Sequence, residues 1–260
     1  MEKVTAAQET VEPSSKHDAK PLPVLYRRPR PLDPARHGGM SLKRMTSFAF
    51  ARETNSVPLN GVEFPMAMRH YPIVFTAGSP PTPVAVLGVR PDRNLFVSAW
   101  GGWTDGLYVP AYVRRYPFIF MGEADRDRFV LCLDEASDLL TKDSKRPLFA
   151  DGKPTDVVRH ALDFCTEFQA QHTATIDFAR AVEARGLLVD NRADISLVSG
   201  ETLRLGGFRI IDEGRFNALP DEVFLDWRRK GWLHLVYCHL MSMVNWGRLA
   251  DLDEKAKAAR

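Results

Sequence analysis

The chain has 260 residues, 45% of them hydrophobic and 26% charged, with a formal net charge of +2 at pH 7. This composition is ordinary for a soluble globular protein, and the length suffices to bury a substantial core in one large domain or two small ones. The small net charge argues against a nucleic-acid partner.

Most of the positive excess lies near the N-terminus, where residues 16–44 carry eight Lys or Arg residues against two Asp residues. Residues 1–52 lack hydrophobic periodicity and are rich in Pro, Ser, Lys and Arg, which predicts a disordered basic tail. We expect this tail to be solvated, with contact to an acidic partner or a membrane surface as the alternative.

Cysteine usage and hydropathy indicate the compartment. The three cysteines, Cys132, Cys165 and Cys238, stand far apart without CxxC spacing, as in proteins of a reducing compartment. The N-terminus has no apolar signal region, and the most apolar stretch, 232–246, is too short and too polar to span a bilayer. These features predict a cytoplasmic protein without a membrane span.

Residues 53–252 are predicted to form a single α+β domain. Its first part, 53–150, consists of short apolar runs separated by turn residues, a pattern typical of strands. The strands are expected at 72–77, 83–89, 94–100, 117–122 and 128–135.

The second part of the domain, 151–252, is rich in helical patterns. Residues 154–185 predict one long helix or two, ended by Gly186. A hairpin is expected next, with strands at 194–199 and 202–212.

A helix opened at Pro220 and interrupted at Gly231 ends the domain. Apolar residues surround much of its continuation from Trp232, which predicts a central buried helix. Residues 253–260 are expected to fray. Together the elements predict a largely antiparallel sheet with long C-terminal helices packed on one face.

An internal duplication accounts for part of the sheet. Pro65–Phe75 aligns with Pro110–Phe120 at a constant offset of 45, with five of eleven columns identical. In each segment a proline suits the first helical turn, and Pro72 or Pro117 ends the helix before a strand. A second strand follows in both, so the pattern predicts a duplicated helix–strand–strand unit.

The duplication leaves its basic residues unexplained: Arg69, His70, Arg114 and Arg115. One interpretation is that each side chain ties its short helix to a neighbouring carboxylate or carbonyl. The other is that the arginines of two pseudo-symmetric units converge on one carboxylate-bearing ligand, which guanidinium groups bind bidentately.

Four motifs occur in order along the chain: VPLN, YVPAYVRRYPF, LCLDE and LGGFRIIDEGRFNALPDE. With them the chain resembles the SapC family over roughly 56–252. The resemblance implies a role linked to surface-layer protein secretion, in the neighbourhood of cupin-type oxygenases and flavin-dependent halogenase-like proteins. Such an enzyme, or its substrate, is the partner that the resemblance implies. It supplies no catalytic residues.

The loop Ser98–Tyr108 is the most site-like segment, because three aromatic residues stand among glycines there. Exposed aromatics beside arginines are typical of peptide-binding surfaces. The predicted binding residues are Trp100, Trp103, Tyr108, Tyr112, Arg114 and Arg115. The structural alternative is that the aromatic rings fold inward over the sheet edge.

Two other clusters carry weaker alternatives. Asp134 and Glu135 end a predicted strand, where they suit a general base or a cap for the next segment. His234 and Cys238 share a helix face and offer two metal ligands, but His239 points elsewhere, so a packed core helix is favoured and no metal is predicted.

No nucleotide-binding, hydrolase or metalloprotease motif is present. We therefore expect a non-enzymatic adaptor without a cofactor, which holds a peptide or protein partner in a surface-protein modification or export pathway. The alternative is an enzyme of unrecognised type, with Asp134 or Glu135 as base and Arg114 or Arg115 as anion clamp.

Overall fold

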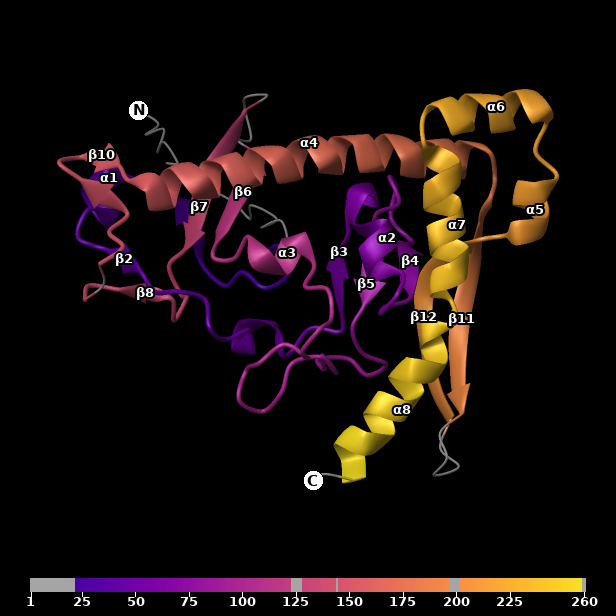
Figure 1. Ribbon diagram of the computed structural model, residues 1–260, viewed down its shortest axis with the longest axis horizontal. Coiled ribbons are helices and arrows are strands. Elements are labelled where there is room, and N and C mark those ends of the chain that lie inside the picture. The colour runs from indigo at the N-terminus through magenta and orange to yellow at the C-terminus, as the bar shows by residue number, and fades with distance from the viewer. Residues whose placement is uncertain (1–21, 123–127, 144, 197–201, 259–260) are drawn as a thin grey trace, which may run out of the picture.

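The computed structural model describes residues 22–122, 128–143, 145–196 and 202–258. Within them the chain is an α+β protein whose sheets are antiparallel, as predicted. A 29-residue helix, α4 (Asp156–Ala184), runs across the top of the molecule above both larger sheets (Figure 1). The long helical pattern is therefore one helix, and Gly186 follows it with a positive φ of 65°, as a C-terminal glycine should.

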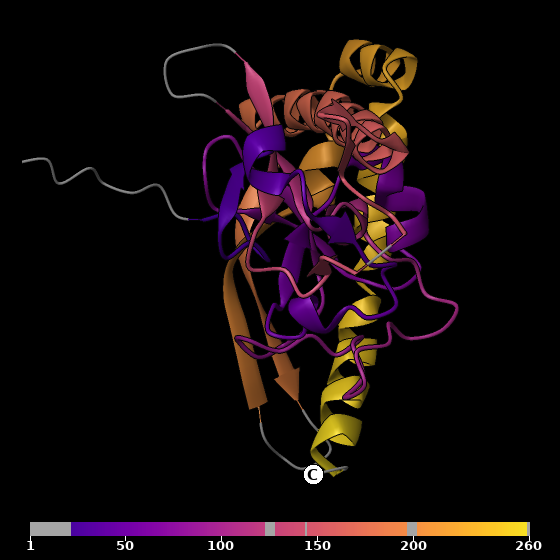
Figure 2. The same cartoon turned by 90° about the vertical axis from the view of Figure 1, so that its left-hand side faces the viewer.

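The larger sheet has five strands in the order β11-β12-β4-β5-β3. Their bounds are β3 Ser56–Pro58, β4 Ile73–Thr76, β5 Pro83–Val86, β11 Leu188–Ser196 and β12 Thr202–Ile211. The hairpin strand β11 begins six residues earlier than its apolar pattern indicated. The predicted turn at 199–201 lies outside the described residues. Turned by 90°, the view shows the β11–β12 hairpin projecting away from α4 beside the C-terminal helix (Figure 2).

The smaller sheet has three strands in the order β1-β7-β6. Their bounds are β1 Pro29–Pro31, β6 Phe118–Gly122 and β7 Phe129–Asp134. Two-stranded pairs join β2 (Ser41–Leu42) to β8 (Leu140–Thr141) and β9 (Phe149–Ala150) to β10 (Lys153–Pro154).

Both copies of the duplicated unit form the helix, strand and strand that the sequence predicts. In the first, α2 (Phe64–Ala67) precedes β4 and β5; in the second, α3 (Ala111–Arg114) precedes β6 and β7. Each unit also gains a third strand on the same side, because β3 pairs with β5 and β1 pairs with β7. The third strands stand at a different sequence offset, so the alignment did not show them.

The prediction of a disordered tail up to residue 52 is wrong for residues 22–52. In that segment β1, α1 (Pro34–His37), β2 and the 3₁₀ turn η1 (Ala49–Ala51) are built into the fold. Tyr26 is 3% exposed, and its hydroxyl donates to the Phe118 carbonyl at 2.6 Å. A proline-rich strand lacks amide donors and suits the edge of a sheet, which explains why it carries no helix or core-strand pattern. Residues 1–21 lie outside the described residues.

The helices after β12 are α5 (Glu213–Asn217), α6 (Asp221–Arg229), α7 (Trp232–Ser242) and α8 (Asn245–Ala258). Gly231, at φ 72°, interrupts the helix between α6 and α7 as predicted. The expectation of a central buried helix is wrong for α7, because Tyr237 and Met241, four residues apart on one face, are exposed. The opposite face packs on the five-stranded sheet, so α7 is amphipathic.

The C-terminal residues 253–258 do not fray as expected. They continue α8, and the fully buried Asp253 pairs with Arg90 Nε at 3.0 Å and with Arg93 Nη1 at 3.7 Å.

The predicted strand at 94–100 is replaced by a loop in which Val97 forms a single bridge to Trp103. The 3₁₀ turn η2 (Gly61–Glu63) leads directly into α2.

Candidate functional site

The loop around Trp100 presents a fully accessible indole on a fixed backbone. Trp100 is 93% exposed. The Ala99 carbonyl accepts from Arg52 Nη2 at 2.8 Å, and the Gly101 carbonyl accepts from the Phe48 amide at 2.7 Å. Gly101 has φ 85°, and a Cβ there would stand 2.0 Å from Ser47 Oγ, so only glycine fits. These contacts restrict the backbone conformation of the loop, which therefore holds the Trp100 side chain outward.

Two other predicted binding aromatics belong to the core instead. Trp103 is 7% exposed and its Nε1 donates to the Tyr71 hydroxyl at 3.1 Å. Tyr112 is 5% exposed and its hydroxyl donates to the Val24 carbonyl at 3.0 Å. The inward-folded alternative therefore holds for Trp103, and Tyr112, in α3, is buried as well, so neither ring lies on the surface with Trp100.

A groove between α3 and α4, here called the basic groove, contains the predicted arginines. Its volume is about 230 Å³, and no acidic side chain is among its lining residues. Its cationic and titratable lining residues are Lys43, Arg114, Arg115, Arg146 and His160. Its apolar and aromatic lining residues are Leu42, Met45, Tyr116, Phe118, Leu139, Val157, Ala161 and Phe164.

Arg115 is a half-buried charge held by aromatic rings. Its guanidinium carbon lies 4.1 Å from the Tyr112 ring centroid, 4.3 Å from that of Phe168 and 5.8 Å from that of Tyr26. Its Nε is buried without a hydrogen-bond partner, and in the described part of the chain Arg115 forms no ion pair with a carboxylate. Burial raises the pKa of Tyr26 and of Tyr112, so their hydroxyls stay protonated and supply no counter-charge.

Arg114 separates the basic groove from a neighbouring cavity of about 260 Å³. Its Nη2 donates to the Tyr108 hydroxyl at 3.2 Å, and that hydroxyl donates to Glu63 Oε1 at 2.9 Å. Burial raises the pKa of Glu63, and burial with the charge of Glu63 raises the pKa of Tyr108 to about 12. Arg114 thus has a nearby carboxylate, whereas Arg115 does not.

Glu63 was not singled out from the sequence. It closes a capping box with Asn60, whose backbone amide donates to Glu63 Oε2 at 2.9 Å. Its Oε1 also accepts from the Ala111 amide at 2.7 Å, which links the helices of the two units. The Asn-x-x-Glu spacing is the sequence signal for this role.

Asp134, a candidate base, is fully buried and serves the fold. Its oxygens accept from the amides of Arg27 at 3.1 Å and Arg28 at 2.7 Å, and from the Tyr116 hydroxyl at 3.1 Å. A further bond from the Ala136 amide, at 3.2 Å, caps the following turn, as the capping alternative predicts. Asp134 therefore fixes the N-terminal segment to the second unit.

Glu135, the other candidate base, lies in a cluster of cations. Its carboxylate accepts from Arg36 Nε, and it lies 3.4 Å from Arg28 Nε and 3.3 Å from His37 Nε2. The hydrogen bond from Arg36 lowers the pKa of Glu135 below its usual range. A carboxylate stabilised in its charged form is a poor base, and this cluster ties α1 to the end of β7.

The histidines of α7 are used in packing. His239 is fully buried; its Nδ1 donates to the Ile73 carbonyl at 2.7 Å, and its Nε2 accepts from the Ile211 amide at 3.0 Å. Burial lowers the pKa of His239 to about 4. His234 Nε2 lies 3.8 Å from Cys238 Sγ, and the described residues contain no group of three side chains arranged to hold a metal.

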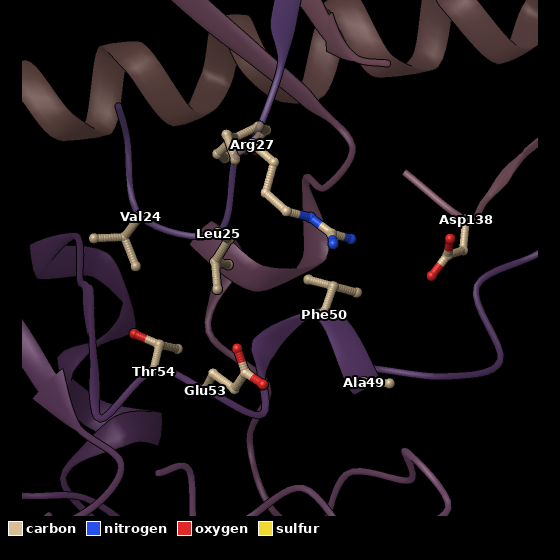
Figure 3. A pocket seen from close by; sticks show the side chains of 9 residues that line it. Val24, Leu25, Arg27, Ala49, Phe50, Glu53, Thr54 and Asp138 are labelled. Atoms are coloured by element: carbon tan, nitrogen blue, oxygen red, sulfur yellow. The ribbon is translucent and has the colours of Figure 1, made fainter. Parts of the chain in front are cut away.

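A further cavity, of about 440 Å³, lies between the N-terminal segment and the turn around η1. Arg27 extends toward Phe50 and Asp138, with Glu53 across the cavity (Figure 3). Charges of both signs line it, so it does not select one kind of ion as the basic groove does.

A family model described as SapC matches residues 32–249, which is more than half of the chain. The chain belongs to the SapC family. The match begins between β1 and α1, so the SapC region includes much of the segment that was predicted to be a tail. Neither the curated proteins nor the solved structures contain a match to this SapC chain.

None of the helices described in this SapC protein combines the length and the apolar character needed to cross a bilayer. The groove residues Lys43, Arg146 and His160 were missed in the sequence. They stand far from Arg115 along the chain, and only the i, i+4 spacing of His160 and Phe164 on α4 gave a local sign of a shared face.

Proposed function

We propose that this SapC-family protein is a non-enzymatic binding or adaptor protein that holds a peptide or protein partner through the basic groove. The observation that carries the proposal is that Arg115, which forms no ion pair with a carboxylate in the described residues, lies at a groove without acidic lining residues. A partly buried charge without a counter-ion costs free energy, and an anionic group of a partner would offset that cost.

The aromatic rings explain how the free protein tolerates the charge. Cation–π contacts from Tyr112 and Phe168 are worth about 1–2 kcal/mol each when desolvated, and they fix the plane of the guanidinium. A pre-oriented guanidinium loses little entropy on binding, so it suits recognition.

Trp100 is the second proposed contact. A large aromatic side chain on a fixed loop is typical of interface residues that contribute most of a binding energy. No interaction joins Trp100 to Arg114 or Arg115 in the described residues, so the two contacts are proposed as separate points on one partner.

The pathway rests on the family resemblance alone. We propose that the partner is a modifying oxygenase or halogenase-like enzyme of a surface-protein pathway, or the substrate of one. The enzyme alternative loses its two candidate bases, because Asp134 and Glu135 hold the N-terminal segment, whereas its anion clamp, Arg114 and Arg115, lines the basic groove.

The duplication supplies a matched control for the test. Arg114→Gln/Arg115→Gln changes the second unit, and Arg69→Gln/His70→Gln changes the same columns of the first. Each tagged form is recovered from its own cells after crosslinking, and bound proteins are quantified by mass spectrometry. A partner is then purified and its Kd measured.

We expect a partner that the wild type and the Arg69→Gln/His70→Gln form retain, and that the Arg114→Gln/Arg115→Gln form binds at least about tenfold more weakly. Equal retention of the partner by all three forms, with folding intact, contradicts the proposal that the partner binds at the basic groove. Recovery of the chain with no partner contradicts the adaptor role.

A further inference from the structure

We infer that the basic groove recognises a carboxylate attached to an apolar or aromatic body. The sources of that chemistry on a protein partner are a C-terminal carboxylate on a hydrophobic last residue and an acidic side chain beside one. This inference rests on the proposed function, because it names the group by which the partner is held.

The charge of the lining selects an anion. Cations reach the groove from three parts of the chain: the segment after β2, the end of α3 and the segment before β9. The first turns of α4 form one wall, where the positive end of the helix dipole adds to the field. With no acidic lining residue, these charges attract one sign only.

The apolar part of the lining selects the body that carries the anion. Phe118, Phe164 and Leu139 belong to the same groove as the cations. A bare inorganic ion would leave this apolar surface uncovered, whereas a hydrophobic side chain would bury it. The volume of about 230 Å³ equals roughly eight waters, which suits one amino-acid side chain with its carboxylate.

The nature of the proposed partner, a protein, favours a carboxylate over a phosphate. Arg114 already donates from Nε to the Val109 carbonyl at 3.0 Å and from Nη2 to Tyr108, and Lys43 Nζ donates to the Asp138 carbonyl at 3.2 Å. These bonds use one of the three Lys43 N–H groups and two of the five Arg114 N–H groups, so donors remain for either anion. The carboxylate is preferred because carboxylates are the anionic groups of an unmodified protein partner. The Arg115 guanidinium lies beside the Tyr112 and Phe168 rings and its Nε is buried, so a planar carboxylate would be bound through its terminal nitrogens.

Small probes test the chemistry directly. N-acetylphenylalanine, its amide, phenyl phosphate and acetyl-Glu-Phe-amide are titrated into the full chain and followed by NMR. The protein forms are the wild type, Arg115→Gln, Lys43→Gln and His70→Gln. Lys43 is exposed, so its variant tests the groove even where Arg115→Gln lowers stability.

For the wild type we expect N-acetylphenylalanine to bind at least tenfold more tightly than its amide and more tightly than phenyl phosphate. Arg115→Gln should weaken binding at least tenfold and Lys43→Gln about threefold, and His70→Gln should leave it unchanged. If acetyl-Glu-Phe-amide binds more tightly than N-acetylphenylalanine, the carboxylate comes from an acidic side chain of the partner and not from its C-terminus. Equal affinity for acid and amide, or a preference for phosphate, overturns the inference.

Competition separates this inference from the proposed function. If the purified partner binds but N-acetylphenylalanine neither binds nor displaces it, the adaptor role stands and the carboxylate chemistry is wrong. If the probe binds through Arg115 but no partner depends on the groove, the site stands and the adaptor role is wrong.

Discussion

The two copies of the duplicated unit share a local fold but place the same sequence columns in different surroundings. In the first unit, Arg69 is exposed, and burial with the charges of Arg248 and Arg69 lowers the pKa of His70. In the second, Arg114 and Arg115 line the basic groove. The repeated motif therefore determines the helix, the strands and the turn, but not the chemistry of its basic residues.

The helix that covers each unit makes the difference. The C-terminal helices cover the first: Asn245 Nδ2 donates to the Met68 carbonyl at 2.7 Å, and His239 bonds to Ile73. Helix α4 packs on both units: its Phe178 contacts Phe64 and Phe75 of the first, but only in the second does it contact a basic residue of the repeat, where Phe168 packs on Arg115. The alternative interpretation, in which arginines of both units converge on one ligand, does not fit the structure, because no residue of the first unit lines the basic groove.

The N-terminal strand β1 pairs with β7 of the second unit, and Tyr26→Ala tests how much that unit depends on the segment. Removing a buried aromatic ring and its bond to Phe118 should cost about 3–5 kcal/mol of unfolding free energy. Denaturant unfolding measures the loss, and hydrogen exchange should show β6 and β7 opening first. Val24→Ala, at an exposed side chain, is the control; a similar small effect of both changes would mean that the segment is dispensable.

Low pH should destabilise the first unit through protonation of His239. Its folded pKa of about 4 lies below the ordinary value near 6.5, so below pH 6.5 the unfolded state binds a proton that the native state does not. Stability is therefore complete above pH 6.5 and falls as the pH drops toward 4, by about 3 kcal/mol in total.

Chemical unfolding at several pH values measures this loss. His239→Gln should flatten the dependence, whereas His234→Gln, an exposed position on the same helix, should not. Hydrogen exchange at pH 5 should increase in β4 and β12 before β6 and β7. An unchanged pH dependence in His239→Gln would contradict the assignment.

The equivalent tyrosines Tyr71 and Tyr116 allow a matched comparison. The Tyr71 hydroxyl donates to the Tyr108 carbonyl and accepts from Trp103, so Tyr71→Phe leaves two buried groups unpaired and should cost about 2 kcal/mol. Tyr116→Phe should cost about 1 kcal/mol, because Asp134 keeps three backbone donors. Paired unfolding curves decide the order, and a larger cost at Tyr116 would reverse it.

Trp100→Ala should have the smallest effect on stability, within about 0.5 kcal/mol, because the indole is 93% exposed. Trp103→Ala is the buried counterpart and should cost about 3–5 kcal/mol. Partner affinity should fall with Trp100→Ala although the fold is intact. Unchanged affinity would remove Trp100 from the proposed contact while leaving the basic groove untouched.

Features that depend on neighbouring residues were predictable from the sequence. The proline–tyrosine motif, the alternating apolar runs and the long helical period predict both units, the α+β class and α4. Gly186 and Gly231 mark helix ends because φ is positive there. Arg114 and Arg115 were found as candidates because their columns carry a charge that the repeat does not explain.

Tertiary structure alone decided the rest. A proline-rich edge strand has no periodic signature, so β1 and the role of Asp134 in holding it follow only from pairing across a hundred residues. Burial separated Trp100 from Trp103, although both stand in one loop. The basic groove brings Lys43, Arg115 and His160 together through packing of α4 on the second unit, and such long-range contacts depend on chain geometry that no local pattern encodes.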